Sequence, residues 1–333
     1  MRSIIVLLCI GLTLLSSCVE APVKDQIGTF DSMGTTILVR PSSALTIVKK
    51  CFENVDTTMS EWKNNSTITE INKNAGLSSV ECPAMVCETV ELSLLLAKQT
   101  GGAFDPTWAC MWELWDFKNP SLPTQEKIEA LLPLVNWEDV VVEGNTVRLE
   151  KEGMMLGLGA IAKGIALNDA RAALLHEGFK NFMIVAGGQV VSQGNSISVG
   201  IRSPDGTLNE FAAEVTIQNS SISTSGDYEN YFEVDGVRYH HIIDPRTGYP
   251  VQNGIRSVTV ICEDAAVADA LSTALFVMGA KPAIAYVDSV EGIEALIITE
   301  NDGMLYSSNF AEFLNNANSV EGSSSTNLIS AGD

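Results

Sequence analysis

The apolar residues of this 333-residue chain repeat at two spacings that alternate along it. From Leu45 to Met59 they recur every three to four residues, which predicts an amphipathic helix with one buried side. Shorter β-branched runs, which predict strands, lie between such helical segments. Since no internal repeat and no Pro- or Ser-rich linker divides the sequence, we expect one α+β unit, with a smaller lobe near residues 60–150.

Glycines and turn residues bound most of these segments. Besides 45–59, helices are expected over residues 83–99, 124–135, 161–178 and 265–278, the last with Asp264 as N-cap and Gly279 as its end. A strand is expected over residues 29–40, interrupted at 33–35, and another over 257–262. Hairpins are expected over 140–149 and 231–243, the second turning on Asp235-Gly236. Residues 183–191 predict a strand with a bulge or a close backbone approach at Gly187-Gly188.

The composition excludes some classes of partner and ligand site. With 46% hydrophobic and 18% charged residues, the chain can bury a sizeable core. The formal net charge of −21 would be repelled by phosphate backbones, so we expect no nucleic-acid partner. In so acidic a protein, an anionic ligand needs a local source of positive charge to bind it: a metal ion, a helix N-terminus or a lysine at the site.

The N-terminus has the features of an export signal. Arg2 precedes an apolar run over residues 4–15, which is too short to span a bilayer as a mature helix. Leu15-Ser16-Ser17-Cys18 resembles the lipobox of bacterial lipoproteins, which implies removal of residues 1–17 and lipidation of Cys18. We therefore expect a tether over 18–28, a domain over 29–314, and a membrane-anchored lipoprotein that faces the periplasm or the extracytoplasmic side. The alternative is an ordinary cleaved signal in which the cysteine is incidental.

The remaining cysteines form no full disulfide framework. Five of them follow Cys18, an odd number, so at least one thiol stays unpaired within the chain. Cys82 and Cys87 could pair, although buried free cysteine is the commoner state in a protein of this size. Zinc-site spacing is absent. The segment 315–333 is mostly Ser, Asn and Gly, which predicts a disordered tail.

A glycine-rich segment, Gly157-Leu158-Gly159-Ala160-Ile161-Ala162-Lys163-Gly164, lies where a strand gives way to a helix. Glycines let backbone amides approach a phosphate, the helix N-terminus favours negative charge, and Lys163 adds a cation. The alternative interpretation is a tight turn with a surface lysine.

A second cluster lies on the predicted helix 265–278. Residues four apart share one face, so the Asp269 carboxylate and the Thr273 hydroxyl can converge, with Ser272 nearby. Hard oxygen ligands suit Mg²⁺, which needs few protein ligands when phosphates and waters complete its shell. The alternative is a polar seam in which Thr273 bonds back to a carbonyl.

A third cluster combines Thr224-Ser225-Gly226-Asp227-Tyr228 with residues 240–248. If Asp235-Gly236 is a two-residue turn, Tyr231 faces His240 and Asn230 faces His241. Neighbouring strand residues point to opposite faces, so at most one histidine can serve a given site, and we choose His241. A purely structural histidine remains the alternative.

Together these clusters resemble the ApbE-type FAD:protein FMN transferases, over about residues 30–279. The motifs occur in the family's order: Phe30-Asp31-Ser32-Met33-Gly34-Thr35, Met59-Ser60-Glu61-Trp62, Thr100-Gly101-Gly102-Ala103-Phe104-Asp105-Pro106, the segment 159–164, Ala186-Gly187-Gly188, Thr224-Ser225-Gly226-Asp227-Tyr228, His241-Ile242-Ile243-Asp244-Pro245-Arg246-Thr247-Gly248 and Ala268-Asp269-Ala270-Leu271-Ser272-Thr273-Ala274. The resemblance implies a T-fold-related mixed sheet with flanking helices and a smaller helical lobe.

The resemblance also implies an activity and a site. FMN would pass from FAD to a threonine of an acceptor flavoprotein subunit of a membrane redox pump, with Mg²⁺ bound and AMP released. The implied metal site is Ala160 through its carbonyl, Asp269, Ser272 and Thr273. As catalytic side chains we expect Lys163, which adds a second positive charge at the phosphates, and either His241 or Asp227, which orients or deprotonates the incoming hydroxyl. The implied FAD-binding positions are Met33, Trp62, Ala103, Phe104, Asp105, Gly157, Lys163, Ser225, His241 and Ile243.

Two positions depart from the family pattern. Gly157 and Gln189 stand where most relatives have aspartate, and each replacement removes a carboxylate near the expected site. Two other functions therefore stay open. With water as the nucleophile the chain would be a Mg²⁺-dependent FAD pyrophosphatase, and without catalysis it would be an FAD-binding lipoprotein.

Overall fold

The computed structural model describes residues 26–117, 119–207, 210–301, 303–315 and 329–330. Its main body is an eight-stranded sheet in the order β1-β2-β6-β7-β10-β13-β14-β15, in which every neighbouring pair is antiparallel. The strands are β1 (Gly28–Ser32), β2 (Thr35–Arg40), β6 (Phe182–Ala186), β7 (Gln189–Gln193), β10 (Ser221–Gly226), β13 (Ile255–Cys262), β14 (Ile293–Thr299) and β15 (Met304–Tyr306). The predicted α+β class is confirmed.

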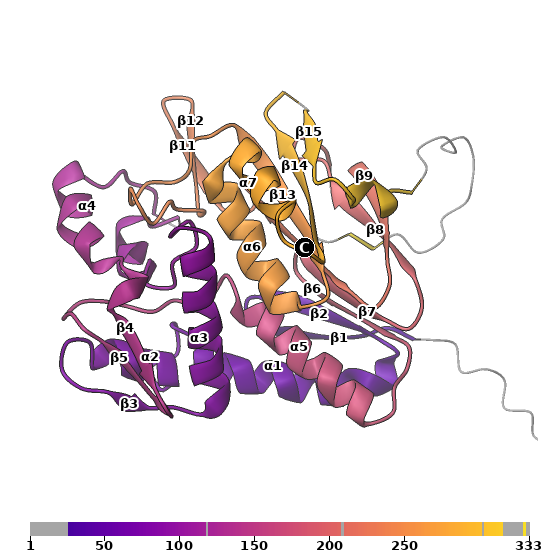
Figure 1. The fold of residues 1–333 in the computed structure, drawn as a ribbon, viewed down its shortest axis with the longest axis horizontal. Helices are drawn as coiled ribbons and strands as arrows, with labels where there is room; N and C mark the ends of the chain where they lie inside the picture. Colours follow the sequence, from indigo (N-terminus) through magenta and orange to yellow (C-terminus); the bar gives the residue numbers. More distant parts are fainter. Residues whose placement is uncertain (1–25, 118, 208–209, 302, 316–328, 331–333) are drawn as a thin grey trace, which may run out of the picture.

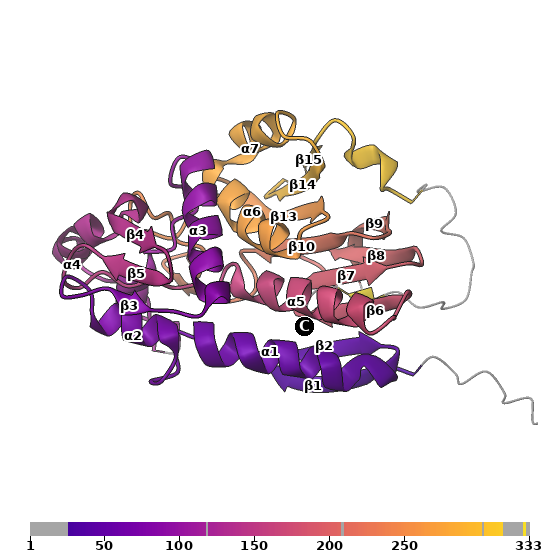
Figure 2. The same ribbon diagram turned by 60° about the horizontal axis from the view of Figure 1, so that its bottom comes forward.

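Helices cover one face of this sheet (Figures 1 and 2). They are α1 (Leu45–Met59), α5 (Ala162–His176), α6 (Ala265–Met278) and α7 (Ala280–Val287). Helix α5 packs between α1 and α6, and α6 lies against β10 and β13. The apolar stripe predicted for α1 is buried, with Val48, Phe52 and Val55 fully inside the core. At the N-terminus of α6 the Asp264 carboxylate accepts hydrogen bonds from the Ala266 and Val267 amides, as expected for an N-cap.

The opposite face of the sheet carries a second, smaller sheet. Strands β8 (Ile197–Arg202) and β9 (Phe211–Ile217) are antiparallel, and β16 (Ile329–Ser330) runs parallel to β8. Apolar side chains of both sheets form a separate core that includes Val190, Val215 and Phe310. The segment 329–330, in the predicted tail, thus forms a strand, and Asn315 donates from its backbone to the Glu214 carbonyl. The rest of that tail lies outside the described residues.

The smaller lobe contains strands as well as helices and lies at the left of Figure 1. Its elements are α2 (Thr67–Lys73), α3 (Ala84–Gln99), the 3₁₀ helix η2 (Ala109–Leu114), α4 (Gln125–Leu131) and a sheet of β3 (Val80–Glu81), β5 (Thr146–Leu149) and β4 (Val140–Glu143). The sequence prediction did not include α2, although Ser66 caps it by accepting a hydrogen bond from the Thr69 amide. The lobe shares one apolar core with the helical face of the main body.

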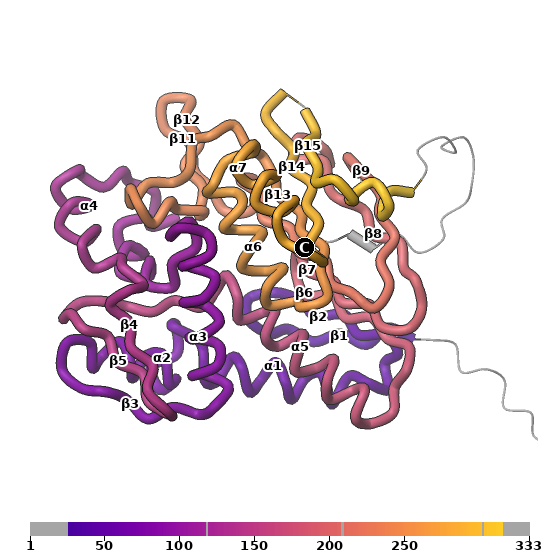
Figure 3. Tube along the Cα trace, viewed as in Figure 1, coloured from indigo at the N-terminus to yellow at the C-terminus, as the bar shows by residue number. Residues whose placement is uncertain are grey.

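The predicted hairpin joins the main body to the lobe. Strands β11 (Tyr231–Val234) and β12 (Val237–His240) pair Tyr231 with His240, as expected, and the hairpin projects at the top of Figure 3, between α4 and α7. Asp235 and Gly236 both have positive φ, which this turn requires. The Phe232 ring stacks on Tyr239, and Tyr239 stacks on Trp115 of the lobe.

Two strand predictions were wrong in form. Residues 29–40 are not one interrupted strand but the antiparallel hairpin β1–β2, which turns at Met33-Gly34, where both residues have positive φ. Residues 183–191 are not one bulged strand but the hairpin β6–β7, because Gly187 takes a φ of 58° and reverses the chain. The expected close approach does occur: a Cβ at Gly188 would lie 2.9 Å from the Thr224 carbonyl oxygen. This contact brings the Gly187-Gly188 turn onto β10.

The N-terminal predictions fall outside the described part of the chain. These are the signal 1–17, Cys18 and the tether as far as residue 25. Among the helices that the structure describes, none is long and apolar enough to cross a membrane. The five later cysteines are buried and free, and burial raises the pKa of the Cys51 and Cys82 thiols to about 12, which makes them poor nucleophiles.

Candidate functional site

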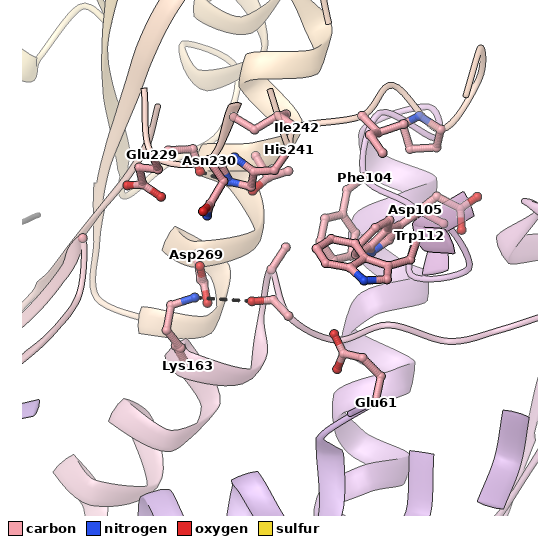
Figure 4. Close-up of a pocket in the computed structure, with 18 of the residues that line it drawn as sticks. Glu61, Phe104, Asp105, Trp112, Lys163, Glu229, Asn230, His241, Ile242 and Asp269 are labelled. Atoms are coloured by element: carbon pink, nitrogen blue, oxygen red, sulfur yellow. Dashed lines mark hydrogen bonds between the residues drawn. The ribbon is translucent and has the colours of Figure 1, made fainter. Parts of the chain in front are cut away.

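A cavity of about 320 Å³ lies between the main body and the lobe. Figure 4 shows its two walls: Glu229, Asn230 and His241 from the main body on one side, and Phe104 and Trp112 from the lobe on the other. Residues from seven separate segments line it, namely Glu61, Trp62, Ala103, Phe104, Asp105, Trp108, Trp112, Gly159, Ala160, Lys163, Gly188, Gln189, Thr224, Ser225, Glu229, Asn230, His241, Ile242, Ile243, Pro245, Asp269 and Thr273. The three predicted clusters therefore meet in one place.

A close contact between two helices forms the floor of this cavity. A Cβ added at Gly164 in α5 would lie 2.3 Å from the Ala265 carbonyl oxygen in α6, so only glycine allows these backbones to meet. The contact brings the first turn of α5 to Asp269, whose carboxylate accepts a hydrogen bond of 3.2 Å from the Gly164 amide. The glycine-rich segment thus positions a carboxylate of the neighbouring helix.

Three oxygen groups on this floor suit a hard cation. The Ala160 carbonyl, the Asp269 carboxylate and the Thr273 hydroxyl all border the cavity. The Ala160 carbonyl accepts no hydrogen bond from the residues that the structure describes, and Asp269 keeps one carboxylate oxygen without a partner there. No group of three or more His, Cys, Asp and Glu side chains in the described part could hold a metal. One carboxylate with neutral oxygens therefore fits Mg²⁺, which takes water and phosphate for the rest of its shell.

Ser272, predicted at the edge of the metal site, lies behind it. Its side chain is fully buried and donates to the Asp269 carbonyl at 2.8 Å. Its hydroxyl also lies 2.7 Å from the Ser225 hydroxyl, which in turn is 3.3 Å from that of Thr273. Ser225 lines the cavity and Ser272 does not, so Ser272 can orient Ser225 and Thr273 from behind.

Lys163 provides positive charge among several carboxylates. Its ammonium donates to the Gly159 carbonyl at 3.4 Å, the contact marked in Figure 4. Glu61 and Glu229 border the same cavity, and burial raises the pKa of each carboxyl above its ordinary value while the Lys163 charge acts in the opposite direction. An anion in this cavity would lie near Lys163, but it would also need a second cation to offset these carboxylates.

His241 offers an unpaired ring nitrogen at the cavity. Its Nδ1 is buried and has no hydrogen-bond partner among the described residues, while its backbone amide donates to the Asn230 carbonyl at 2.9 Å. Burial, with smaller contributions from His240 and Lys163, lowers the pKa of His241 to about 4. The ring is therefore neutral at pH 7, and the lowered pKa makes it a weaker base than an ordinary histidine. His240 lies in the core, with Nε2 2.8 Å from the Val251 carbonyl, so it is the structural histidine of the pair.

Asp227 is not part of the cavity lining. Arg256 Nε lies 2.8 and 3.0 Å from its two carboxylate oxygens, and Arg238 Nη1 adds a third contact at 3.2 Å. Arg256 also binds Asp205 at 2.8 Å. Because both oxygens are engaged by arginine, this carboxylate is poorly placed to take a proton from a substrate. It fixes the end of β10, two residues beyond Ser225.

The structure places most of the expected FAD-binding positions at the cavity. Met33 lies in an adjoining groove, which also contains Glu61, Trp62 and Lys163. Gly157 is buried away from the cavity, and its Cβ position would lie 2.8 Å from Ala109 Cβ, so packing leaves no room there for a carboxylate. The positions that do line the cavity are Trp62, Ala103, Phe104, Asp105, Lys163, Ser225, His241 and Ile243.

Asp105 has a structural task at this wall. Its carboxylate accepts hydrogen bonds from the amide and hydroxyl of Thr107, at 2.8 and 2.6 Å, and from the Trp137 amide at 3.1 Å. Burial raises the pKa of this carboxyl, whereas these bonds lower it. Asp105 thereby folds the loop that presents Phe104 to the cavity.

Sequence reasoning missed several cavity residues. Trp108, Trp112 and Glu229 line the cavity, and none of the sequence motifs includes them. The exposed fraction of Gln189 is 3%, and its side-chain oxygen has no hydrogen-bond partner among the described residues. Glu61 and Gln189 each carried a signal, since Glu61 lies in the motif that contains Trp62 and Gln189 stands where most relatives have aspartate.

Comparison with known proteins gives a consistent result. The ApbE family model matches residues 33–297. The chain is 31% identical to the FAD:protein FMN transferase of Treponema pallidum over 278 residues, 77% of each chain. It is 30% identical to that of Vibrio cholerae serotype O1 over 324 residues, which cover 91% of this chain and 97% of the relative. The crystal structure of the ApbE protein of Thermotoga maritima superimposes with a TM-score of 0.81 at 31% identity, covering 88% of this chain and all of that one.

Proposed function

Because the chain belongs to the ApbE family and is an FAD:protein FMN transferase, we propose that its cavity binds FAD with Mg²⁺ and transfers FMN to an acceptor threonine. The threonine oxygen forms a bond to the FMN-side phosphorus, the bond from that phosphorus to the bridging oxygen breaks, and AMP leaves with the electron pair. The hydroxyl proton passes to a base of the enzyme. The product is a phosphoester between FMN and the acceptor protein.

One observation carries this proposal. The Ala160 carbonyl, the Asp269 carboxylate and the Thr273 hydroxyl lie on the floor of the same cavity that contains Lys163 and His241. Mg²⁺ held by these oxygens would neutralise a diphosphate and stabilise the charge that builds on its non-bridging oxygens. In a chain of net charge −21, such a local cation makes a dianionic ligand tolerable.

The side chains of the cavity have separate tasks in this mechanism. Lys163 pairs with a phosphate oxygen as a mobile point charge. His241, whose Nδ1 is unpaired among the described residues, accepts the hydroxyl proton. Between the two bases considered from the sequence we choose His241, because arginines occupy both oxygens of Asp227. Phe104 offers an aromatic face on which a flavin ring can stack.

A mass and nucleotide assay tests the proposal. The chain from Gln26 is incubated with FAD and Mg²⁺, with and without the soluble domain of an exported flavin-acceptor subunit. Acceptor that gains one FMN as AMP appears supports transfer. AMP and FMN formed equally well without acceptor would instead support the pyrophosphatase, and FAD that stays bound and intact would support the FAD-binding lipoprotein.

We also propose that the enzyme acts outside the cytoplasmic membrane, anchored by lipid at Cys18. The support is the N-terminal sequence, in which a short apolar run precedes Leu15-Ser16-Ser17-Cys18. Two or three acyl chains give stable attachment, whereas one is marginal. Cys18→Ser should release the full-length protein from the membrane fraction of expressing cells, and continued membrane association would contradict the anchor.

A further inference from the structure

A second depression adjoins the cavity. It has a volume of about 670 Å³, and we call it the aromatic groove. It shares Trp62, Trp112 and Asn230 with the cavity, so the two depressions adjoin at these three residues. The residues that line the groove are Trp62, Trp112, Glu113, Trp115, Asp116, Phe117 and Asn230.

The positions expected to bind FAD leave this groove unused. Every expected FAD-binding residue that borders a depression lies in the cavity or in the groove that contains Met33. Apart from Trp62, which borders all three depressions, none lies in the aromatic groove. A transferase that joins FMN to a protein needs a path for its second substrate, and the aromatic groove adjoins the cavity at Trp62, Trp112 and Asn230.

The groove has the chemistry of a protein contact. The distance between ring centroids is 4.8 Å for Trp62 and Trp112, 6.2 Å for Trp112 and Phe117, and 5.7 Å for Phe117 and Phe232. This row of rings leads from the cavity to the β11–β12 hairpin. Trp62 is 61% exposed, which leaves a large apolar surface in water beside the site. Aromatic side chains of this kind supply much of the binding energy where polypeptides meet.

The acidic residues of the groove restrict the charge of a polypeptide segment that could bind there. Its charged residues in the described part are Glu113 and Asp116, both acidic, and Glu229 adjoins Asn230 at its inner end. The chain as a whole carries −21. A segment with acidic side chains next to its threonine would be repelled here, whereas apolar and basic side chains would be attracted.

We propose that the aromatic groove docks the acceptor polypeptide, in the form of an exposed segment with apolar side chains and a lysine or arginine near its threonine. This inference rests on the proposed function, since it assigns a place to the second substrate of that reaction. The segment lies along Trp112 and Phe117 with its basic side chain at Glu113, and its threonine enters the cavity past Trp62 and Asn230.

A charge-swap experiment tests this docking. Two forms of the soluble acceptor domain are compared, one with Lys and one with Glu placed two residues from the threonine, at saturating FAD and Mg²⁺. Wild-type enzyme should show a kcat/KM about threefold or more higher for the Lys form, the size expected of one solvent-exposed charge pair. Glu113→Lys should abolish or invert this preference and leave the Kd for FAD unchanged. Glu291→Lys makes the same charge change in the turn between α7 and β14, and should keep the wild-type preference.

The outcomes separate this inference from the proposed function. Transfer with the same preference in wild type and Glu113→Lys overturns the docking groove and leaves the transferase intact. A preference lost equally in Glu291→Lys also overturns it, because net charge would then explain the effect. If wild type transfers no FMN to either acceptor form, the proposed function and the docking both fall.

Discussion

Replacing Gly164 by alanine should damage the cavity floor more than it damages the fold. The added Cβ would lie 2.3 Å from the Ala265 carbonyl oxygen and 2.4 Å from Ala266 Cα. These are backbone atoms, so no side-chain rotation relieves the contact. To restore van der Waals distance, α5 and α6 must move apart by about 1 Å at this point.

The energetic consequence has two parts of opposite sign. Overpacking of a core contact costs about 1–3 kcal/mol, and the upper part of that range applies because backbone must move. Alanine favours the helix by about 1 kcal/mol relative to glycine. The net loss in the free energy of unfolding should therefore be about 2 kcal/mol. The same displacement breaks the 3.2 Å bond from the Gly164 amide to Asp269, so the effect of Mg²⁺ on FAD affinity should fall about tenfold or more.

Two measurements on the purified chain check this. Urea unfolding gives the free energy of unfolding, and fluorescence titration with FAD at several Mg²⁺ concentrations gives the metal response. Ala172→Gly, at an exposed position of the same helix, is the control, since it should cost about 1 kcal/mol through helix propensity and leave the Mg²⁺ response unchanged. A Gly164→Ala protein with wild-type stability and wild-type Mg²⁺ response would refute the reasoning.

Three further predictions concern the buried charges and the metal. Arg256→Gln should cost about 3–5 kcal/mol in urea unfolding, because Asp227 loses its main partner, and Arg256→Lys should cost less; equal losses would argue against the ion pair. Asp269→Asn should remove the effect of Mg²⁺ on FAD affinity while the protein stays folded by circular dichroism, and a retained response would exclude Asp269 as a ligand. Burial lowers the pKa of His240 from 6.5 to about 4. Between these two pH values the unfolded chain binds a proton at His240 and the folded chain does not, so the free energy of unfolding should fall as the pH falls. The slope from this group is at most about 1.4 kcal/mol per pH unit. His240→Gln should reduce that slope, and an unchanged slope would assign it to other groups.

The elements with strong local signals were predictable from the sequence. Helices α1 and α6 and the β11–β12 hairpin follow from apolar spacing, an aspartate cap and an Asp-Gly turn. The sequence could not show that Gly187-Gly188 reverses the chain, because a glycine pair permits a bulge and a turn equally well. Nor could it predict α2, which is short and depends on the Ser66 cap.

The site was predictable where its parts lie on one element and less so where they depend on packing. The spacing of Asp269 and Thr273 on one helix placed both at the cavity. The position of Asp227, by contrast, is decided by Arg256, which is 29 residues further along the chain. Likewise the burial of Gly157 against Ala109 depends on how the lobe folds, and no local pattern records that contact.

The most direct test of the account is to locate the metal and the diphosphate. Crystals of the chain from Gln26, soaked with FAD and Mn²⁺ as a stand-in for Mg²⁺, would show the metal by its anomalous scattering. The account predicts one peak between the Asp269 carboxylate and the Thr273 hydroxyl, in contact with the diphosphate and with Lys163 beside it. A diphosphate bound elsewhere in the cavity, with no metal at Asp269, would contradict the account.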